Sequence, residues 1–304
     1  MLPEKCSCKI KNAKGKVMKL HFMKYRKLSY WVSGLLVGLS IFALVFKGLN
    51  YGIDFAGGIS MEVTPVNAEF TIDKMRAELA QFSPELQEID GGAVLIRVGL
   101  PKGATDVMQN QRVSEIKHIL GENVNYAQVQ IVGPKIGGEL VRGGILAILV
   151  SFILMSVYIW IRYRGGYAVG SFVSLLLDFV LMFGFFSVMG LEFNQTAIAV
   201  ILMGVGYSIN DKVVNYDRID ENIKKYHKMP MDDLIDLSVN EMLSRTLRTS
   251  VSTILALVGI YIFGNQMLRE FSIAMTFSIV MGTATSIYIS NVILYHFNLR
   301  ETKY

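Results

Sequence analysis

The chain has 304 residues, of which 52% are hydrophobic and 18% are charged, and its mean hydropathy is +0.41. Soluble domains usually carry about 45–50% apolar and about 25% charged residues. Here the charge is also segregated, because almost all of it lies outside a few long apolar runs. This pattern excludes a disordered chain, a disulfide-stapled secreted domain and a soluble enzyme built around one core, and it predicts a polytopic α-helical membrane protein.

The N-terminal residues 1–27 hold nine of the 30 Lys and Arg against a single acid, Glu4. Basic residues beside a membrane span mark the cytoplasmic side, so we expect a basic cytoplasmic tail and no nucleic-acid partner. The tail suits contact with anionic membrane lipid, and a plain topology signal explains it equally well. Cys6 and Cys8 lack the second pair of ligands that zinc needs, so we expect no metal site.

Six apolar runs approach or exceed the roughly 20 residues that cross a bilayer. They cover residues 28–46, 143–161, 165–191, 193–210, 249–268 and 271–299. The first belongs to a transmembrane helix predicted over 28–49, which is too long for a cleaved signal peptide and is read as an uncleaved anchor. Glu192 predicts a tight hairpin between the third and fourth runs. Six spans put both termini in the cytoplasm, in agreement with basic residues at Arg162, Arg300 and Lys303.

Residues 50–139, between the first two spans, hold 12 acidic and 7 basic residues. This acidic excess fits the side opposite the N-terminus, which predicts a domain outside the cytoplasm. Alternating strand patterns occur at 59–63, 86–89, 93–98 and 124–132, and helical patterns at 71–80 and 107–120. The order βαββαβ predicts a small α+β ferredoxin-like domain. No catalytic constellation is visible in it, so we expect it to touch a partner or client.

Two carboxylates lie in the predicted five-helix region over 140–304. Asp178 is at the midpoint of the third run, where an unpaired charge is expensive and marks a functional candidate. A protonated Asp178 that only hydrogen-bonds a neighbouring helix is an equally good explanation. Asp211 ends the fourth run beside the small residues Gly204 and Ser208, which share one helix face and allow close helix approach. The alternative interpretation of Asp211 is a solvated carboxylate at a helix end that has no functional role.

Arg245 opens the fifth run from the side at which the fourth run ends. If both helices extend a turn or two past their apolar cores, Asp211 and Arg245 lie at similar depth. Arg245 can equally be a basic residue that snorkels to the interface. Between these runs, a segment at about 215–242 alternates charge at helical spacing and predicts a cytoplasmic amphipathic segment.

Four short segments resemble motifs of the SecF subunit of the bacterial Sec protein-export machinery, in the SecD/SecF family. Residues 51–58 resemble its Gly-Ile-Asp-Phe-x-Gly-Gly signature, and residues 131–140 resemble its Val-Gly-Pro-x-Val-Gly segment. Residues 206–222 resemble its Ser-Ile-Asn-Asp motif, and residues 243–253 its Leu-Ser-Arg-Thr stretch. The matching residues are Gly52, Asp54, Gly57, Gly58, Gly133, Pro134, Ser208, Asn210, Asp211, Asp217, Arg218 and Arg245. The chain departs from the motifs at Lys212, usually Thr, and at Asp220, usually Arg.

The resemblance implies an accessory subunit that pairs with a six-span SecD partner, in a pseudo-symmetric arrangement like that of resistance-nodulation-division transporters. With the SecYEG channel it would use the proton gradient, without a cofactor, to move preprotein clients across the inner membrane. Asp211 would be the proton carrier, Arg245 its charge partner, and Asp178 the family's third-span acid. Protonation of Asp211 would release Arg245 and let the periplasmic domain swing on glycines such as Gly57 and Gly137, although such glycines also serve tight turns.

Two other functions share these features. A proton-coupled small-molecule or lipid exporter of the same superfamily would also carry a membrane carboxylate. However, 90 residues are few for the large outer domain that would line its substrate path. In a non-transport membrane assembly factor, the buried charges would only hold neighbouring helices together. An intramembrane enzyme is disfavoured, because the spans contain no paired catalytic carboxylates, Ser-Lys dyad or metal-ligand cluster.

Overall fold

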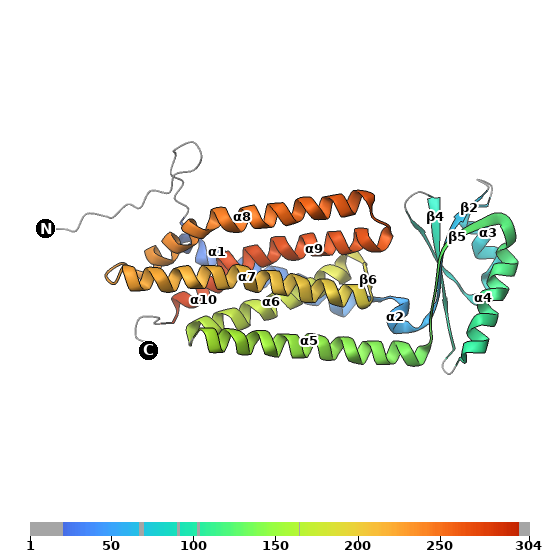
Figure 1. The fold of residues 1–304 in the computed structure, drawn as a ribbon, viewed down its shortest axis with the longest axis horizontal. Helices are drawn as coiled ribbons and strands as arrows, with labels where there is room; N and C mark the ends of the chain where they lie inside the picture. Colours follow the sequence, from blue (N-terminus) through green and yellow to red (C-terminus); the bar gives the residue numbers. More distant parts are fainter. Residues whose placement is uncertain (1–20, 67–69, 90–91, 102–103, 164, 298–304) are drawn as a thin grey trace.

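The structure is a computed structural model that describes residues 21–66, 70–89, 92–101, 104–163 and 165–297. An elongated helical bundle carries a small α/β domain at one end (Figure 1). We call this the domain end of the bundle, and the opposite end, where the first helix begins, the terminal end. The tail up to residue 20, with Cys6 and Cys8, and the C-terminal Arg300 and Lys303 lie outside the described residues.

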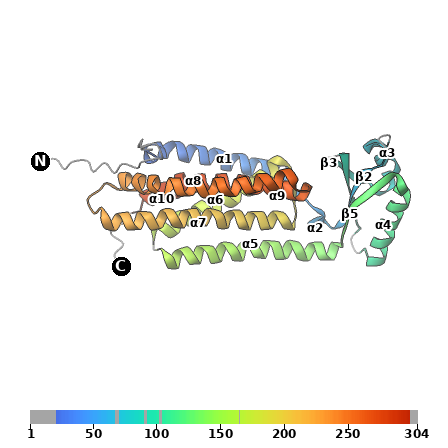
Figure 2. The same cartoon turned by 45° about the horizontal axis from the view of Figure 1, so that its top comes forward.

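Within the described residues, six helices are long and apolar enough to cross a membrane, which confirms the six predicted spans. They are α1 (Arg26–Phe46), α5 (Pro134–Arg162), α6 (Gly166–Met189), α7 (Gln195–Lys225), α8 (Met231–Phe263) and α9 (Gln266–Ala284). A π-helical segment (Thr285–Ser290) and α10 (Asn291–Tyr295) continue α9. Helices α6, α7 and α9 form the buried centre, and α1 and α5 lie on opposite sides of it (Figure 2).

Small residues on α7 let α9 approach closely, as the shared face of Gly204 and Ser208 predicts. A Cβ added to Gly204 would overlap the hydroxyl of Ser278 on α9, and one added to Gly282 would come within 2.9 Å of the Ser208 Cβ. Helices in lipid associate through van der Waals contact and polar bonds, because lipid tails supply no hydrophobic drive between them. The glycines therefore set the spacing at which polar side chains of α7 meet those of α9.

The α/β domain has the predicted order βαββαβ. Its elements are β2 (Gly58–Pro65), α3 (Ile72–Glu78), β3 (Glu85–Ile89), β4 (Ala93–Gly99), α4 (Asp106–Leu120) and β5 (Val124–Val132). The antiparallel sheet has the strand order β3-β4-β2-β5, which is the ferredoxin-like arrangement. Alternate residues of β2, namely Ile59, Met61 and Val63, are fully buried in the domain's own apolar core. The sequence prediction of a ferredoxin-like domain is confirmed.

The remaining alternate residues of the sheet make a polar face. Ser60 pairs with Arg97 of β4 on one side and with Gln130 of β5 on the other. This face looks toward the domain end of the bundle, whereas α3 and α4 cover the other face (Figure 1). The two alternating patterns of β2 thus serve different purposes: one builds the domain and the other faces the membrane part.

A short segment after α1 joins the two parts. β1 (Asn50–Tyr51) pairs in parallel with β6 (Glu192–Phe193), in the hairpin predicted between α6 and α7. It leads into α2 (Ile53–Ala56), whose Asp54 carboxylate accepts a hydrogen bond from the backbone N–H of Gln195 at 3.1 Å. Asp54 therefore caps the first turn of α7 and ties the α1–β2 connection to the bundle.

Several glycines of this joint lie where turn geometry or a close contact requires them. Gly57 ends α2 with a φ of 72°, a conformation that other residues rarely adopt. A Cβ at Gly58 would lie 2.8 Å from the Val98 carbonyl oxygen, and one at Gly137 would lie 3.0 Å from the Phe55 carbonyl oxygen. Gly133 is the residue before α5, followed by Pro134 in the first turn. Turn geometry and close approach thus account for Gly57, Gly58 and Gly137 without a hinge.

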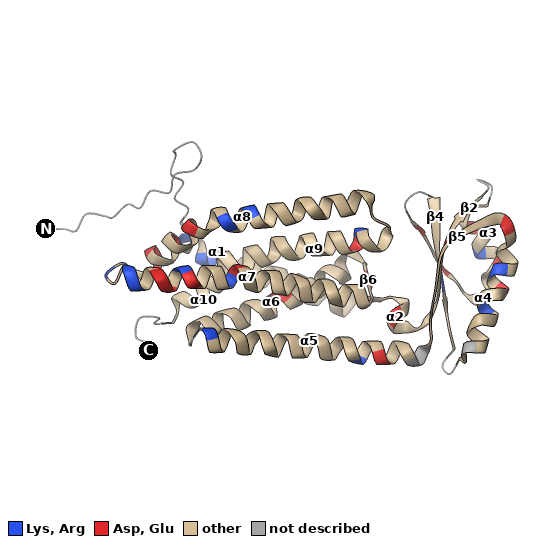
Figure 3. Ribbon diagram, in the orientation of Figure 1, with Lys and Arg blue, Asp and Glu red and all other residues tan. Residues whose placement is uncertain are grey.

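At the terminal end, α7 and α8 continue well past the apolar part of the bundle. The segment predicted at about 215–242 consists of the end of α7, a short turn and the start of α8. A helix of 33 residues such as α8 is about 50 Å long, more than the roughly 30 Å of a hydrocarbon core. Figure 3 shows charged residues gathered on these extensions and on the α/β domain, with a largely uncharged band between them.

Candidate functional site

The centre of the bundle contains a buried ion pair between two helices. Asp178 on α6 is 5% exposed and Lys212 on α7 is completely buried. The ammonium Nζ of Lys212 lies 2.7 Å from Asp178 Oδ2. It also donates to the hydroxyl of Ser208, one turn earlier on α7, and that hydroxyl donates to the same carboxylate oxygen at 2.7 Å. Residues four apart lie on one helix face, so α7 presents Ser208 and Lys212 together to α6.

The π-helical segment supplies a further hydrogen-bond donor to Asp178. The Thr285 hydroxyl donates to Asp178 Oδ1 at 2.6 Å, so both carboxylate oxygens have partners. The same segment brings Ser286 to Asn215 and Ser290 to Tyr216, both on α7. A π-helical insertion rotates the residues that follow it relative to an α-helix, and such insertions recur at functional sites. Here it carries hydroxyl groups onto the polar face of α7.

Asp211 lies beside this pair but has different partners. It is 3% exposed and accepts a hydrogen bond from the Thr283 hydroxyl of α9 at 3.0 Å. A row of hydroxyls continues from Thr283 to Ser250 of α8 at 3.1 Å and from Ser250 to Tyr207 of α7 at 3.4 Å. No ion pair reaches Asp211 in the part of the chain that the structure describes. Asp211 is therefore a buried acid held by a neutral donor.

Arg245 on α8 is exposed on the bundle surface. It is close enough to Asp211 to interact with it electrostatically, as is Lys212, but it makes no direct ion pair with it in the described residues. Asn210 of α7 is also exposed. The structure thus brings Asp211 and Asp178 into one buried cluster through Thr283 and Thr285 and leaves Arg245 at its edge.

Asp217 and Arg218 lie at the terminal end and link helices there. Asp217 accepts hydrogen bonds from Arg162 and from the Tyr163 hydroxyl, both at 2.7 Å. Arg218 pairs with Glu241 of α8 at 2.6 Å, which connects the extensions of α7 and α8. Both residues are therefore helix connectors, and neither is part of the buried cluster.

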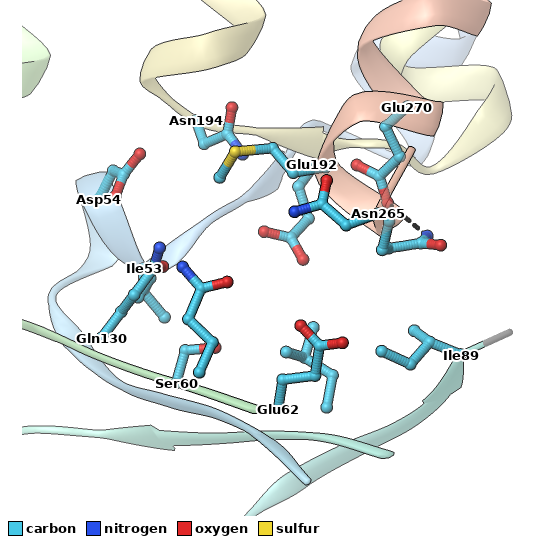
Figure 4. A pocket seen from close by; sticks show the side chains of 14 residues that line it. Ile53, Asp54, Ser60, Glu62, Ile89, Gln130, Glu192, Asn194, Asn265 and Glu270 are labelled. Carbon is cyan, nitrogen blue, oxygen red and sulfur yellow. Dashed lines mark hydrogen bonds between the residues drawn. The ribbon is translucent and has the colours of Figure 1, made fainter. Parts of the chain in front are cut away.

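A second polar region lies between the bundle and the sheet. Figure 4 shows Glu62 and Gln130 of the sheet facing Glu192, Asn265 and Glu270 of the bundle across a pocket. Arg97 of β4 reaches across to form an ion pair with Glu192. Burial lowers the pKa of Arg97, and the carboxylates of Glu85 and Glu270 oppose that effect. Among the described residues, no group of three or more His, Cys, Asp or Glu could hold a metal ion.

The sequence did not reveal three parts of these sites. In the sequence, Lys212 is only a departure from the family motif, yet its ammonium contacts Asp178. Thr283 and Thr285 carry no sequence signal of their contacts with the two acids, because isolated threonines are common in apolar helices. The four-residue spacing of Ser208 and Lys212 was the one signal that could have placed the ammonium on the buried face. The Arg97–Glu192 contact has no sequence signal, because the two residues are far apart in the chain.

Comparison with known proteins identifies the family. Residues 112–300 match the family model of the protein export membrane protein SecD/SecF, C-terminal, and residues 42–68 match the SecD/SecF GG motif. The protein translocase subunit SecF of Rickettsia bellii is 39% identical over 279 residues, which cover 90% of this chain and 91% of the relative. That of Rickettsia conorii is 39% identical over 288 residues, or 92% of both chains.

Solved structures agree with the sequence relatives. The crystal structure of SecDF, a translocon-associated membrane protein from Thermus thermophilus, matches with a TM-score of 0.80 and 30% identity over 91% of this chain. A crystal structure of SecDF in a super-membrane-facing form matches with a TM-score of 0.67 and 29% identity. The chain spans only 38% of the length of these two solved chains. By its motifs, its fold and its relatives, this multi-pass membrane chain belongs to the SecF translocase subunits of the SecD/SecF protein-export family.

Proposed function

We propose that this SecF chain pairs with a SecD partner and uses the proton gradient to advance preproteins through the SecYEG channel of a bacterial inner membrane. The observation that carries the proposal is Asp211, a carboxylate that is buried inside a membrane span of a translocase subunit and has no ion pair among the described residues. Ionisable groups in such positions usually serve ion or proton pathways. The SecD partner is supported by the SecDF structures, of which this chain matches 38%.

The proposed orientation puts the terminal end in the cytoplasm and the α/β domain in the periplasm. The basic residues of the N-terminal tail favour this direction. The α/β domain at the other end of the bundle would then meet a preprotein as it emerges from the channel. Membrane lipid covers the exposed apolar surfaces of α1 and α5.

In the proposed cycle, Asp211 takes up a proton and later releases it. The hydroxyls of Thr283, Ser250 and Tyr207 run from Asp211 toward the domain end, because α7 begins at that end and Tyr207 precedes Asp211 by one turn. They would form the innermost part of a route by which a proton from the periplasm reaches the carboxylate. When Asp211 becomes neutral, its attraction to the nearby Arg245 disappears, and α8 is free to shift relative to α7 and α9.

The test is translocation of a preprotein into vesicles that contain this chain, its SecD partner and the Sec channel. Asp211→Asn removes the exchangeable proton and keeps the shape, so we expect the stimulation by a proton gradient to disappear while gradient-independent translocation persists. Asp220→Asn is the matched control: it makes the same change in the exposed extension of α7, where Asp220 pairs with Lys224 one turn later on the same helix. If a proton gradient stimulates translocation equally well with Asp211→Asn, the proton step is disproved. The buried acids would then only hold the helices together.

A further inference from the structure

Lys212 is a buried cation to which the proposed cycle assigns no role. Its side chain is completely buried, and the contacts of its Nζ are Asp178 Oδ2 and the Ser208 hydroxyl. Although Lys212 follows Asp211 in the sequence, successive residues on an α-helix point about 100° apart. The ammonium therefore lies against α6, and the neighbouring carboxylate of Asp211 points to α9.

The two acids of the cluster differ in the cations and hydrogen-bond donors that surround them. Asp178 has a direct cation and two hydroxyl donors, so a negative charge on this carboxylate is balanced by a cation inside the bundle. Asp211 has one hydroxyl donor and only longer-range attraction from Lys212 and Arg245. A buried charge must be paired or neutralised, because its transfer from water is costly. The cluster thus contains one acid whose charge is balanced within the protein and one whose charge is not.

Other charged and titratable groups also lie on the surrounding helices. Apart from the charged residues on the extensions of α7 and α8 at the terminal end, the described residues of this kind include Tyr207 and Tyr216 on α7, Arg245, Arg248 and Tyr261 on α8, Tyr288 in the π-helical segment, Tyr167 on α6, Arg269 and Glu270 at the start of α9, Arg26, Lys27 and Tyr30 at the start of α1, and Arg142, Tyr158 and Arg162 on α5. None of them forms an ion pair with Asp178, so Lys212 is the ion-pair partner of Asp178 among the described residues.

We propose that Lys212 is a positioning residue whose ammonium keeps Asp178 ionised throughout the cycle, so that Asp211 alone exchanges protons in this cluster. The idea rests on the proposed proton-driven function. During the proposed cycle, the contacts among Asp178, Lys212, Ser208 and Thr285 continue to hold α6, α7 and the π-helical segment together. The change on protonation is confined to the contacts of Asp211 with α9 and α8.

The first test is infrared spectroscopy of the purified membrane protein during acidification, which records the carbonyl band of a protonated carboxyl group. The wild-type protein should show a buried carboxyl band that Asp211→Asn removes and Asp178→Asn leaves unchanged. In Lys212→Met, which has no cation beside Asp178, a second band should appear, and the additional change Asp178→Asn should remove it. Loss of a wild-type band in Asp178→Asn, or no second band in Lys212→Met, would overturn the proposal.

The second test is the pH profile of gradient-stimulated translocation. Lys212→Met and Asp178→Asn each leave one buried group unbalanced, so each should lower the stimulated rate at least tenfold. The double variant, which loses both members of the pair, should recover to within about threefold of wild type and keep the wild-type pH profile. A double variant as inactive as the single ones would show that the pair itself carries protons and contradict the proposal. Asp211→Asn reports separately on the proposed function, because the infrared bands require no transport.

Discussion

At the scale of residues, two carboxylates in one membrane bundle differ in how their charge is balanced. Asp178 is paired with Lys212 at 2.7 Å, whereas Asp211 is held by the Thr283 hydroxyl at 3.0 Å. Breaking a buried ion pair is costly because one uncompensated charge remains, whereas a carboxylate held by a hydroxyl can be neutralised by a proton. This difference favours Asp211 as the mobile-proton site.

Thr283 is the residue on which we expect this site to depend. Thr283→Val keeps the side-chain shape and removes the hydroxyl that donates to Asp211. A hydrogen bond to a charged group contributes about 1.5–3 kcal/mol, so the gradient-stimulated rate should fall about tenfold or more.

Thr283→Ser is the control, since it retains the hydroxyl and should keep most of the stimulated rate. The measurement is gradient-stimulated preprotein translocation in vesicles. Equal rates for the Val and Ser variants would show that Asp211 does not need this donor.

At the scale of elements, α7 offers two glycines two residues apart with opposite surroundings. A Cβ at Gly204 would overlap Ser278 of α9, whereas one at Gly206 would meet no atom within 4 Å. Gly204→Ala should therefore destabilise the bundle by about 1–3 kcal/mol through overpacking. Gly206→Ala should be neutral or slightly stabilising, because alanine favours a helix by about 1 kcal/mol. Thermal unfolding of the purified variants in detergent gives the comparison, and similar melting temperatures would argue against the close α7–α9 contact.

The start of α5 provides a second pair. Gly137 packs on the backbone of α2, where an added Cβ would lie 3.0 Å from the Phe55 carbonyl oxygen and 3.2 Å from that of Asp54, whereas Gly138 faces open space. Gly137→Ala should push α5 away from α2 and lower stability by about 1–3 kcal/mol, and Gly138→Ala should not. The same unfolding measurement applies. If instead both variants keep wild-type stability but lose translocation, these glycines act as hinges.

At the scale of the whole molecule, an ion pair joins the α/β domain to the bundle. Arg97, 8% exposed in its side chain, meets Glu192, 18% exposed, on the hairpin between α6 and α7. Arg97→Gln should leave Glu192 without its cation and loosen the domain from the bundle. Loss of one partner of a buried pair costs about 3–5 kcal/mol, and the partial exposure of Glu192 reduces that value.

Hydrogen exchange can measure this loosening. We expect faster exchange in Arg97→Gln at residues 190–194 and 264–270, because these segments contain Glu192, Asn265 and Glu270 on the bundle side of the pocket. Arg76→Gln is the matched control, because Arg76 is an exposed residue of α3 whose pair with Asp73 lies within the same helix. Unchanged exchange in Arg97→Gln would mean that the covalent connections alone hold the domain in place.

The sequence by itself determined the elements of this protein. Long uncharged runs such as 143–161 specify membrane helices, because a charge in hydrocarbon is expensive and its absence over about 20 residues is informative. The alternation of Ile59, Met61 and Val63 with Ser60 and Glu62 specified a half-buried strand, since side chains of a strand alternate between two faces. These signals are local, and they suffice for six spans and a ferredoxin-like domain. The family motifs added the expected role of Asp211 as the proton carrier.

Only the tertiary structure decided which charges meet. The sequence places Lys212 next to Asp211, but the helical rotation between successive residues turns its ammonium to Asp178, 34 positions earlier. Thr283 and Thr285 reach the two acids because the glycine contacts bring α9 against α7 and a π-helical segment begins at Thr285. Arg97 meets Glu192 because the polar face of the sheet turns toward the bundle. Such contacts depend on helix rotation and packing distance, which a linear pattern of residue types does not contain.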